Sequence, residues 1–166
     1  MNLFTGESAD AFFGGEVPPA VRELLHRAAE TGAQQRTPLL WTAQALAPTC
    51  LAVYYTLYKH HAGRREFEQA EEAARRGLKQ AAAQAGLDED WSAVQPDPRR
   101  DFLHDGPARF WLFTLKALAF IHLRSSRPDE ARALLLQIDR LAPQARLGTD
   151  VTASLLAGGS PGTDRS

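Results

Sequence analysis

Residues 112–145 read LFTLKALAFIHLRSSRPDEARALLLQIDRLAPQA, and they indicate the fold of the whole chain. Its apolar side chains recur every three or four residues on both sides of a polar centre, which predicts two amphipathic helices joined by a turn. Two earlier stretches, 17–50 and 51–84, fall into the same 34-residue register. A fixed period of this length is typical of stacked helical pairs, because each pair leaves one apolar face that only a neighbouring pair can cover.

Specific residues support the shared register when each unit is counted from its first residue. Position 32 is Pro48 in the first unit and Pro143 in the third, where a proline can end the second helix. Position 20 is Ala70 in the second unit and Ala131 in the third. A small side chain there lets two antiparallel helices approach closely. The first unit departs from this pattern, with Arg36 at position 20.

The third unit contains the fullest set of such residues, namely Leu115, Leu118, Ala119, Ala131, Leu135, Ile138 and Pro143. The second unit departs from the same pattern at Tyr58, Gly77 and Ala82. This register resembles the tetratricopeptide repeat, which has small residues near positions 8 and 20, large apolar residues near positions 4, 7, 11, 24 and 27, and proline at 32. The resemblance implies a short right-handed α-solenoid of about three helix pairs, closed by a C-terminal capping helix over 148–157.

The composition agrees with an all-α fold in one domain. The chain has 166 residues, and no segment alternates apolar and polar side chains as a half-buried strand does. We expect the helical-repeat domain over 17–157, after a flexible N-terminal arm over 1–16 and before a disordered tail over 158–166. Within the domain, Pro19 suits the first turn of one helix and the pair Thr37–Pro38 suits the start of the next. Later helices are expected over 49–61, 64–85, 107–124 and 128–141.

An insertion, 85–111, separates the second unit from the third. Its centre is rich in aspartate, proline and glycine, which is turn chemistry. Insertions in repeat folds form loops on one face, often the binding face. Two interpretations are open: a loop that packs Trp91 and Phe102 over the helices, or a lid over a binding groove.

The charge balance does not indicate a nucleic acid or a membrane surface as partner. There are 19 basic and 20 acidic residues, and the formal net charge is −1. The single cysteine, Cys50, cannot form an internal disulfide, and we expect it to be a small buried side chain. The first ten residues lack the basic and apolar stretches of a secretory signal, so we expect a cytoplasmic protein.

In a tetratricopeptide array the first helices of the units line a concave face, and the resemblance implies such a face here. Carried over by register position, this peptide-binding groove presents Tyr55, Lys59, Phe113, Lys116, Phe120 and Arg124. Apolar anchors beside three cations suit an extended or helical peptide, with a preference for acidic or C-terminal segments. The same aromatic residues are equally consistent with core packing in a short array.

The sequence shows no arrangement that indicates catalysis, a cofactor or a metal. His60 and His61 lack a partner at the one-turn spacing that directs two ligands to one ion. The other residues considered as ligands were His104, His122, Cys50 and the acidic run Asp88, Glu89 and Asp90. His61 and His122 both occupy position 11 of their units, which favours a packing role. We expect no catalytic residues, no metal and no cofactor.

These patterns are typical of a protein that binds another protein, as an adaptor or a chaperone-like assembly factor. The stretches 39–55 and 110–118 are also similar to small repeat proteins found beside bacterial nitrogen-fixation genes. That similarity implies an accessory role in nitrogen fixation. A further alternative is a structural homo-oligomer, for instance a homodimer, in which the groove or the segment 147–156 closes on a second copy.

Overall fold

The structure is a computed structural model that describes residues 15–145. It contains six α-helices, α2 (Pro19–Glu30), α3 (Ala33–Leu46), α4 (Leu51–Gly63), α5 (Phe67–Ala85), α6 (Gly106–Arg124) and α7 (Pro128–Leu141), and two 3₁₀ turns, Trp91–Ala93 and Pro143–Ala145. No strand occurs among the described residues, and the all-α prediction is confirmed. The predicted capping helix, the tail and nearly all of the N-terminal arm lie outside the described residues.

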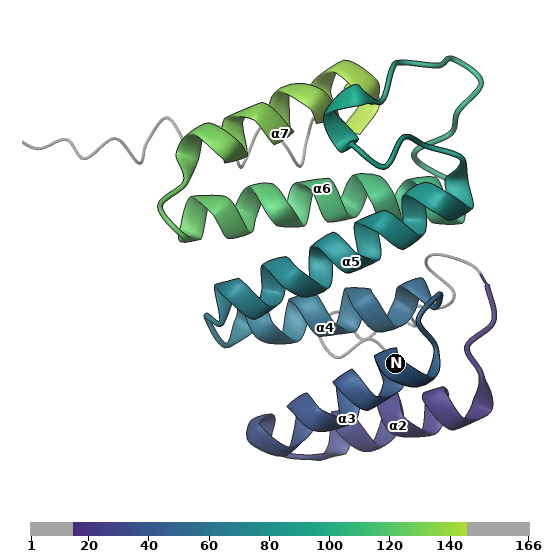
Figure 1. Ribbon diagram of the computed structural model, residues 1–166, viewed down its shortest axis with the longest axis vertical. Helices are drawn as coiled ribbons and strands as arrows, with labels where there is room; N and C mark the ends of the chain where they lie inside the picture. The colour runs from purple at the N-terminus through teal and green to yellow at the C-terminus, as the bar shows by residue number, and fades with distance from the viewer. Residues whose placement is uncertain (1–14, 146–166) are drawn as a thin grey trace, which may run out of the picture.

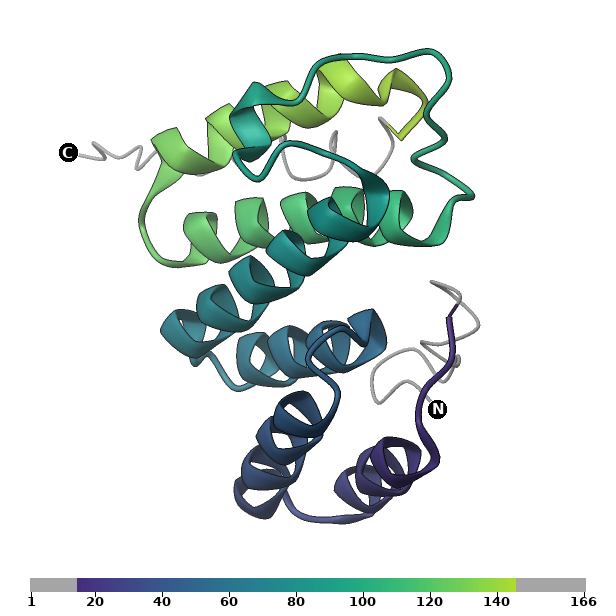
Figure 2. The same cartoon turned by 45° about the vertical axis from the view of Figure 1, so that its right-hand side comes forward.

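The helices stack in chain order, each against the next along the chain (Figure 1). The pair α2 and α3 forms one end of the molecule, α4 and α5 the middle, and α6 and α7 the other end (Figures 1 and 2). Helix α4 also contacts α6, so the first helices of two neighbouring pairs lie beside each other. The largest fully buried side chains, Trp111, Tyr54 and Phe110, belong to these two helices.

The turns inside the second and third pairs have the same backbone geometry. Arg65 and Ser126 both occupy position 15 of the register, and their φ angles are 61° and 60°. In each turn the following residue donates its amide to the carbonyl of the histidine at position 11. These bonds run from Glu66 to His61 at 2.9 Å and from Arg127 to His122 at 2.8 Å. A left-handed residue with a bond reaching back is a common ending for a helix, because it satisfies carbonyls of the last turn.

The second helices show how the proline at position 32 controls helix length. Helices α3 and α7 end with C-caps at Ala47 and Ala142, whose φ and ψ angles are −136° and 70°, and −141° and 72°. Each cap directly precedes the register proline. In the second unit Ala82 stands at that position, and α5 continues to Ala85. It ends there because Gly86 takes the left-handed conformation, with φ of 68°.

Helix α3 begins earlier than the sequence predicts. It starts at Ala33, and Pro38 lies inside the helix instead of at its start. The cause is the side chain of Arg36, which donates Nε to the carbonyl of Ala28 at 2.9 Å and an Nη to that of Thr31 at 3.1 Å. These carbonyls end α2, so the arginine that departs from the repeat pattern fastens the first turn of α3 to the end of α2.

The insertion packs onto the last helix pair. Phe102 is buried, and its ring centroid lies 5.7 Å from that of Trp111 on α6. Val94 is buried in the same core. On α7, the amide of Gln137 donates to the carbonyls of Trp91 and Val94, both at 2.9 Å. These contacts agree with the packed-loop interpretation, and the insertion contributes to the core beside α6 and α7.

Candidate binding groove

A groove runs between α4 and α6 and has a volume of about 470 Å³. It is lined by Tyr55, Tyr58, Lys59, Ala62, Gly63, Phe113, Lys116, Ala117, Phe120 and Ile121. The two helices come from neighbouring pairs and lie side by side, so residues far apart in the sequence share one surface. Among the described residues the lining is apolar apart from two lysines and the tyrosine hydroxyls, and none of these lining residues is acidic.

The structure brings five of the six predicted groove residues together. Tyr55 and Lys59 line the groove from α4, whereas Phe113, Lys116 and Phe120 line it from α6. The sixth residue, Arg124, is not part of the lining. It lies at the C-terminal end of α6, where its guanidinium carbon is 5.9 Å from the ring centroid of Phe120 and 5.9 Å from that of Phe67.

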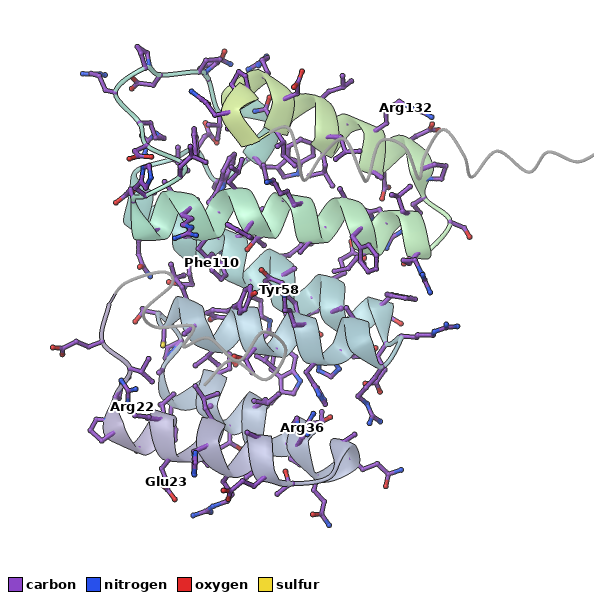
Figure 3. All side chains as sticks on the ribbon, turned by 180° about the vertical axis from the view of Figure 1, so that it is seen from behind. Arg22, Glu23, Arg36, Tyr58, Phe110 and Arg132 are labelled. Atoms are coloured by element: carbon purple, nitrogen blue, oxygen red, sulfur yellow. The ribbon has the colours of Figure 1, made fainter. Side chains whose placement is uncertain are left out.

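The aromatic residues belong partly to the core and partly to the surface. Tyr55 and Tyr58 are buried and form the floor of the groove, with ring centroids 5.6 Å apart in an edge-to-face arrangement. Tyr58 continues inward to Phe110, with centroids 6.4 Å apart (Figure 3). Phe113 is half-buried, and Phe120 is 41% exposed. The floor therefore fits the core-packing alternative, whereas the α6 wall leaves apolar surface in contact with solvent.

Each groove lysine lies over an aromatic ring. Lys59 Nζ is 4.8 Å from the ring centroid of Tyr55, and Lys116 Nζ is 5.5 Å from that of Phe113. Burial lowers the pKa of the Lys116 ammonium below its usual value. In the described part of the chain, Lys59 forms no ion pair with a carboxylate. The groove thus combines apolar surface with positive charge, which suits a ligand that carries both apolar side chains and carboxylates.

Sequence analysis missed Tyr58 as a groove residue. It occupies position 8 of the second unit, where the repeat pattern has a small side chain, and it was interpreted as a departure from that pattern. In the structure its ring forms part of the groove floor, and burial raises the pKa of its phenol well above the usual value. The signal in the sequence was the large side chain at a position where the repeat has a small one. A ring at this position occupies space that a closely packed neighbouring helix would otherwise fill.

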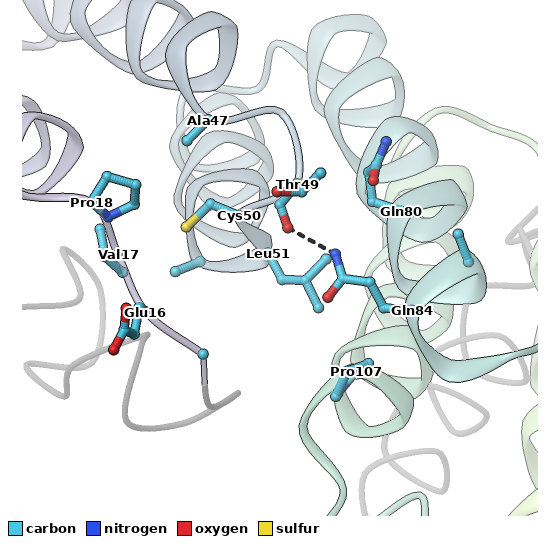
Figure 4. Close-up of a pocket in the computed structure, with 13 residues that line it drawn as sticks. Glu16, Val17, Pro18, Ala47, Thr49, Cys50, Leu51, Gln80, Gln84 and Pro107 are labelled. Carbon is cyan, nitrogen blue, oxygen red and sulfur yellow. Dashed lines mark hydrogen bonds between the residues drawn. The ribbon is translucent and has the colours of Figure 1, made fainter.

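A second hollow, of about 560 Å³, lies at the N-terminal end of α4 (Figure 4). Its lining includes Val17, Cys50 and Ala52, and Gln84 bridges it from α5 by donating to the carbonyl of Thr49 at 2.8 Å. Cys50 is partly exposed in this hollow, so the expectation of a buried thiol is wrong. The cause is the position of Cys50 just before α4 begins, where it packs against the core but keeps part of its surface exposed.

The histidines of α4 lie with Glu66 in a cluster that sequence analysis did not assemble. Their ligand atoms and a Glu66 carboxylate oxygen lie within 4.8 Å of one another. His61 Nε2 accepts a hydrogen bond from Trp41 at 3.0 Å, so its Nδ1 carries the proton and faces Glu66 at 3.2 Å. His60 Nε2 lies 2.8 Å from the Thr37 hydroxyl. Burial, followed by the charge of His61, lowers the pKa of His60 to about 4. The cluster therefore forms hydrogen bonds between α3 and α4.

The comparisons with known proteins give one informative relative. The chain is 32% identical over 162 residues to a protein of Azotobacter chroococcum described as an uncharacterized 19.8 kDa protein in the nifW 5′ region. The match covers 95% of this chain and 89% of the Azotobacter protein. This chain belongs to the family of that protein. The relative agrees with the similarity to proteins encoded beside nitrogen-fixation genes.

No family model matches the chain, and no solved structure matches it either. The tetratricopeptide resemblance therefore rests on the register residues alone. Across residues 15–145, none of the helices combines the length and the apolar character needed to cross a bilayer.

Proposed function

We propose that this protein is a non-catalytic cytoplasmic scaffold that binds an acidic segment of a partner protein in the groove between α4 and α6. In this proposal the chain acts as an adaptor or assembly factor, in the manner of a short α-solenoid of tetratricopeptide-like pairs. The observation that supports it is the combination of two lysines and an exposed phenylalanine in one groove, whose lining within residues 15–145 includes no acidic side chain.

The positions of the groove residues indicate which side chains such a segment needs for binding. Apolar side chains of the ligand would pack over Phe113 and Phe120, which supply the contact area that drives binding. Carboxylates of the ligand would face Lys59 and Lys116, which lie on opposite walls of the groove. Charges in this position select the ligand and speed its encounter more than they add affinity. A short acidic and aromatic segment meets both demands.

A charge-reversal experiment tests this proposal. The variant Lys59→Glu with Lys116→Glu inverts the charge of the groove, and the variant Lys79→Glu with Arg132→Glu makes the same change on exposed parts of α5 and α7. Proteins captured from the native host are compared by quantitative mass spectrometry. We expect one or a few proteins to be retained by the wild type and the control but lost from the groove variant. Equal capture by all three proteins would refute the proposal.

The same proteins distinguish the homodimer alternative. Light scattering on the wild type and on the groove variant reports the oligomeric state directly. A monomer in both cases supports a foreign partner. A wild-type dimer that dissociates in the groove variant would assign the groove to self-association.

We also propose, as a second candidate function, an accessory role in bacterial nitrogen fixation. The supporting observation is the Azotobacter relative, which is described by its place in the nifW 5′ region. The test is deletion of the relative's gene in Azotobacter chroococcum, with growth measured on dinitrogen as the only nitrogen source and on ammonium. We expect slower growth on dinitrogen alone, and recovery when this chain is expressed. Unchanged growth of the deletion strain would count against the role.

A further inference from the structure

The groove and the hollow of Figure 4 lie along the same side of α4. Ala52 lines the hollow, whereas Tyr55 and Lys59 line the groove. The spacing of three and seven residues places these side chains on one face of a helix. With a rise of about 1.5 Å per residue, Ala52 and Lys59 lie roughly 10 Å apart along the axis. A chain that leaves the hollow along α4 therefore enters the groove directly.

The N-terminal part of the chain reaches α4 at this hollow. Val17 is 8% exposed and belongs to the hydrophobic core, so it anchors the chain there. Gly15, Glu16 and Pro18 line the hollow beside it (Figure 4). Gly15, the first described residue, therefore lies next to the N-terminal end of α4.

The composition of residues 1–14 is complementary to the groove in charge and in apolar character. Their sequence is MNLFTGESADAFFG, which contains Glu7 and Asp10 and neither lysine nor arginine. It also carries three phenylalanines, of which Phe12 and Phe13 are adjacent. Carboxylates and aromatic rings in one short segment complement the lysines and the apolar wall of the groove.

We infer that residues 1–14 bind in the groove between α4 and α6 of the same chain. Fourteen residues span at most about 50 Å when extended, several times the distance along α4 to Lys59. Because the segment is tethered beside the groove, its effective concentration there is on the order of millimolar, so modest intrinsic affinity is enough for occupancy. Occupancy has a further consequence that rests on the proposed function: the segment competes with the acidic segment of the partner and so regulates its binding.

Site-specific photo-crosslinking in the full chain tests the inference. Phe12 is replaced by p-benzoylphenylalanine, the protein is irradiated, and the crosslinked peptides are identified by mass spectrometry. We expect crosslinks within the monomer to peptides of α4 or α6. Their yield should fall by on the order of tenfold in the Lys59→Glu, Lys116→Glu background and stay unchanged in the Lys79→Glu, Arg132→Glu background. Crosslinks to other helices, crosslinked dimers, or equal yields in the two backgrounds would overturn the inference.

A second variant separates this inference from the proposed function. Glu7→Lys with Asp10→Lys reverses the charge of the segment and leaves the groove intact. If the segment competes, this variant should capture several-fold more partner than the wild type. Partner capture that depends on the groove lysines, without the crosslink to α4 or α6, would overturn only the inference. The crosslink without lysine-dependent capture would overturn only the proposed function.

Discussion

The indole Nε1 of Trp41 donates a hydrogen bond of 3.0 Å to Nε2 of the buried His61, and this bond joins α3 to α4. A similar contact joins the second unit to the third, and it uses the same register positions, 25 on the second helix and 11 on the first helix of the following unit. There the guanidinium of Arg75 on α5 lies 3.4 Å from Nε2 of the buried His122 on α6. The histidines at position 11 thus connect the second and third helix pairs to the second helix of the preceding pair.

Replacing Trp41 with phenylalanine should destabilise the fold. Trp41→Phe keeps an aromatic ring but removes the donor, so the buried Nε2 of His61 loses its partner. Leaving a buried acceptor unpaired costs about 1–3 kcal/mol of unfolding free energy. Urea unfolding measures the loss. The control is Trp91→Phe in the insertion, which should have a smaller effect because the indole nitrogen of Trp91 makes no hydrogen bond within the described residues. A larger loss for the control would contradict the prediction.

The stability should fall as the pH is lowered from about 6.5 towards 4. Burial, together with the charge of His61, lowers the pKa of His60 to about 4 in the folded protein, whereas the unfolded chain has a pKa near 6.5. Below pH 6.5 the unfolded state therefore binds a proton that the folded state does not, and stability falls by up to about 1.4 kcal/mol per pH unit for this group. Burial also lowers the pKa of His122, which acts in the same direction.

Thermal melts between pH 7 and pH 5 check this prediction. Carboxylates whose pKa is lowered, such as that of Glu71, also contribute to stability. Their contribution is lost only near and below pH 4.5, outside this window. His60→Gln keeps a polar partner for the Thr37 hydroxyl and removes the titration, so the pH dependence should become shallower. Equal slopes for the wild type and His60→Gln would argue against the role of His60.

A methyl group at Gly77 should destabilise the protein although it favours the helix. A Cβ there would lie 2.8 Å from Cβ of Tyr54 and 3.0 Å from the ring of Phe110. Alanine improves helix propensity by about 1 kcal/mol, but overpacking between three helices costs about 1–3 kcal/mol. We expect a net loss for Gly77→Ala in a denaturant melt. The control Gly32→Ala meets no atom within 4 Å, so it carries no overpacking cost and should lose less stability than Gly77→Ala.

Truncating Phe102 should reveal the insertion as part of the core. Phe102 is 5% exposed and lies against Trp111, so Phe102→Ala should cost about 3–5 kcal/mol of unfolding free energy. Leu103→Ala, at the neighbouring exposed position, should cost far less. If both variants melted like the wild type, the insertion would not be packed against the last helix pair.

The helix pairs could be predicted from the sequence because the residue patterns that indicate them are local. Proline at position 32, small residues at position 20 and the apolar period all act within a few turns, and they indicate where the helix pairs lie. In the structure the second helices begin at position 17 of their units, at Ala33, Phe67 and Pro128. The early start of α3 depends on Arg36 reaching carbonyls of the preceding helix, which no local pattern records. The burial of Phe102 and the floor formed by Tyr58 likewise depend on which helices become neighbours in space.

The groove residues were predicted from the resemblance to the tetratricopeptide repeat. The residue types alone do not indicate a groove. Register position placed Tyr55, Lys59, Phe113, Lys116 and Phe120 on one surface because first helices of successive pairs lie side by side. Arg124 lies beyond the lining because α6 ends at that residue. The depth of the groove depends on side-chain packing between α4 and α6, which the sequence does not specify.

Peptide selection tests the binding preference of the groove most directly. A random peptide library displayed on phage is selected in parallel with the full chain, with the Lys59→Glu, Lys116→Glu variant and with the Lys79→Glu, Arg132→Glu control. The wild type and the control should enrich peptides that place aspartate or glutamate beside aromatic or leucine residues, and the groove variant should not retain those peptides. Enrichment without acidic residues, or retention of the same peptides by the groove variant, would contradict binding of an acidic segment between α4 and α6.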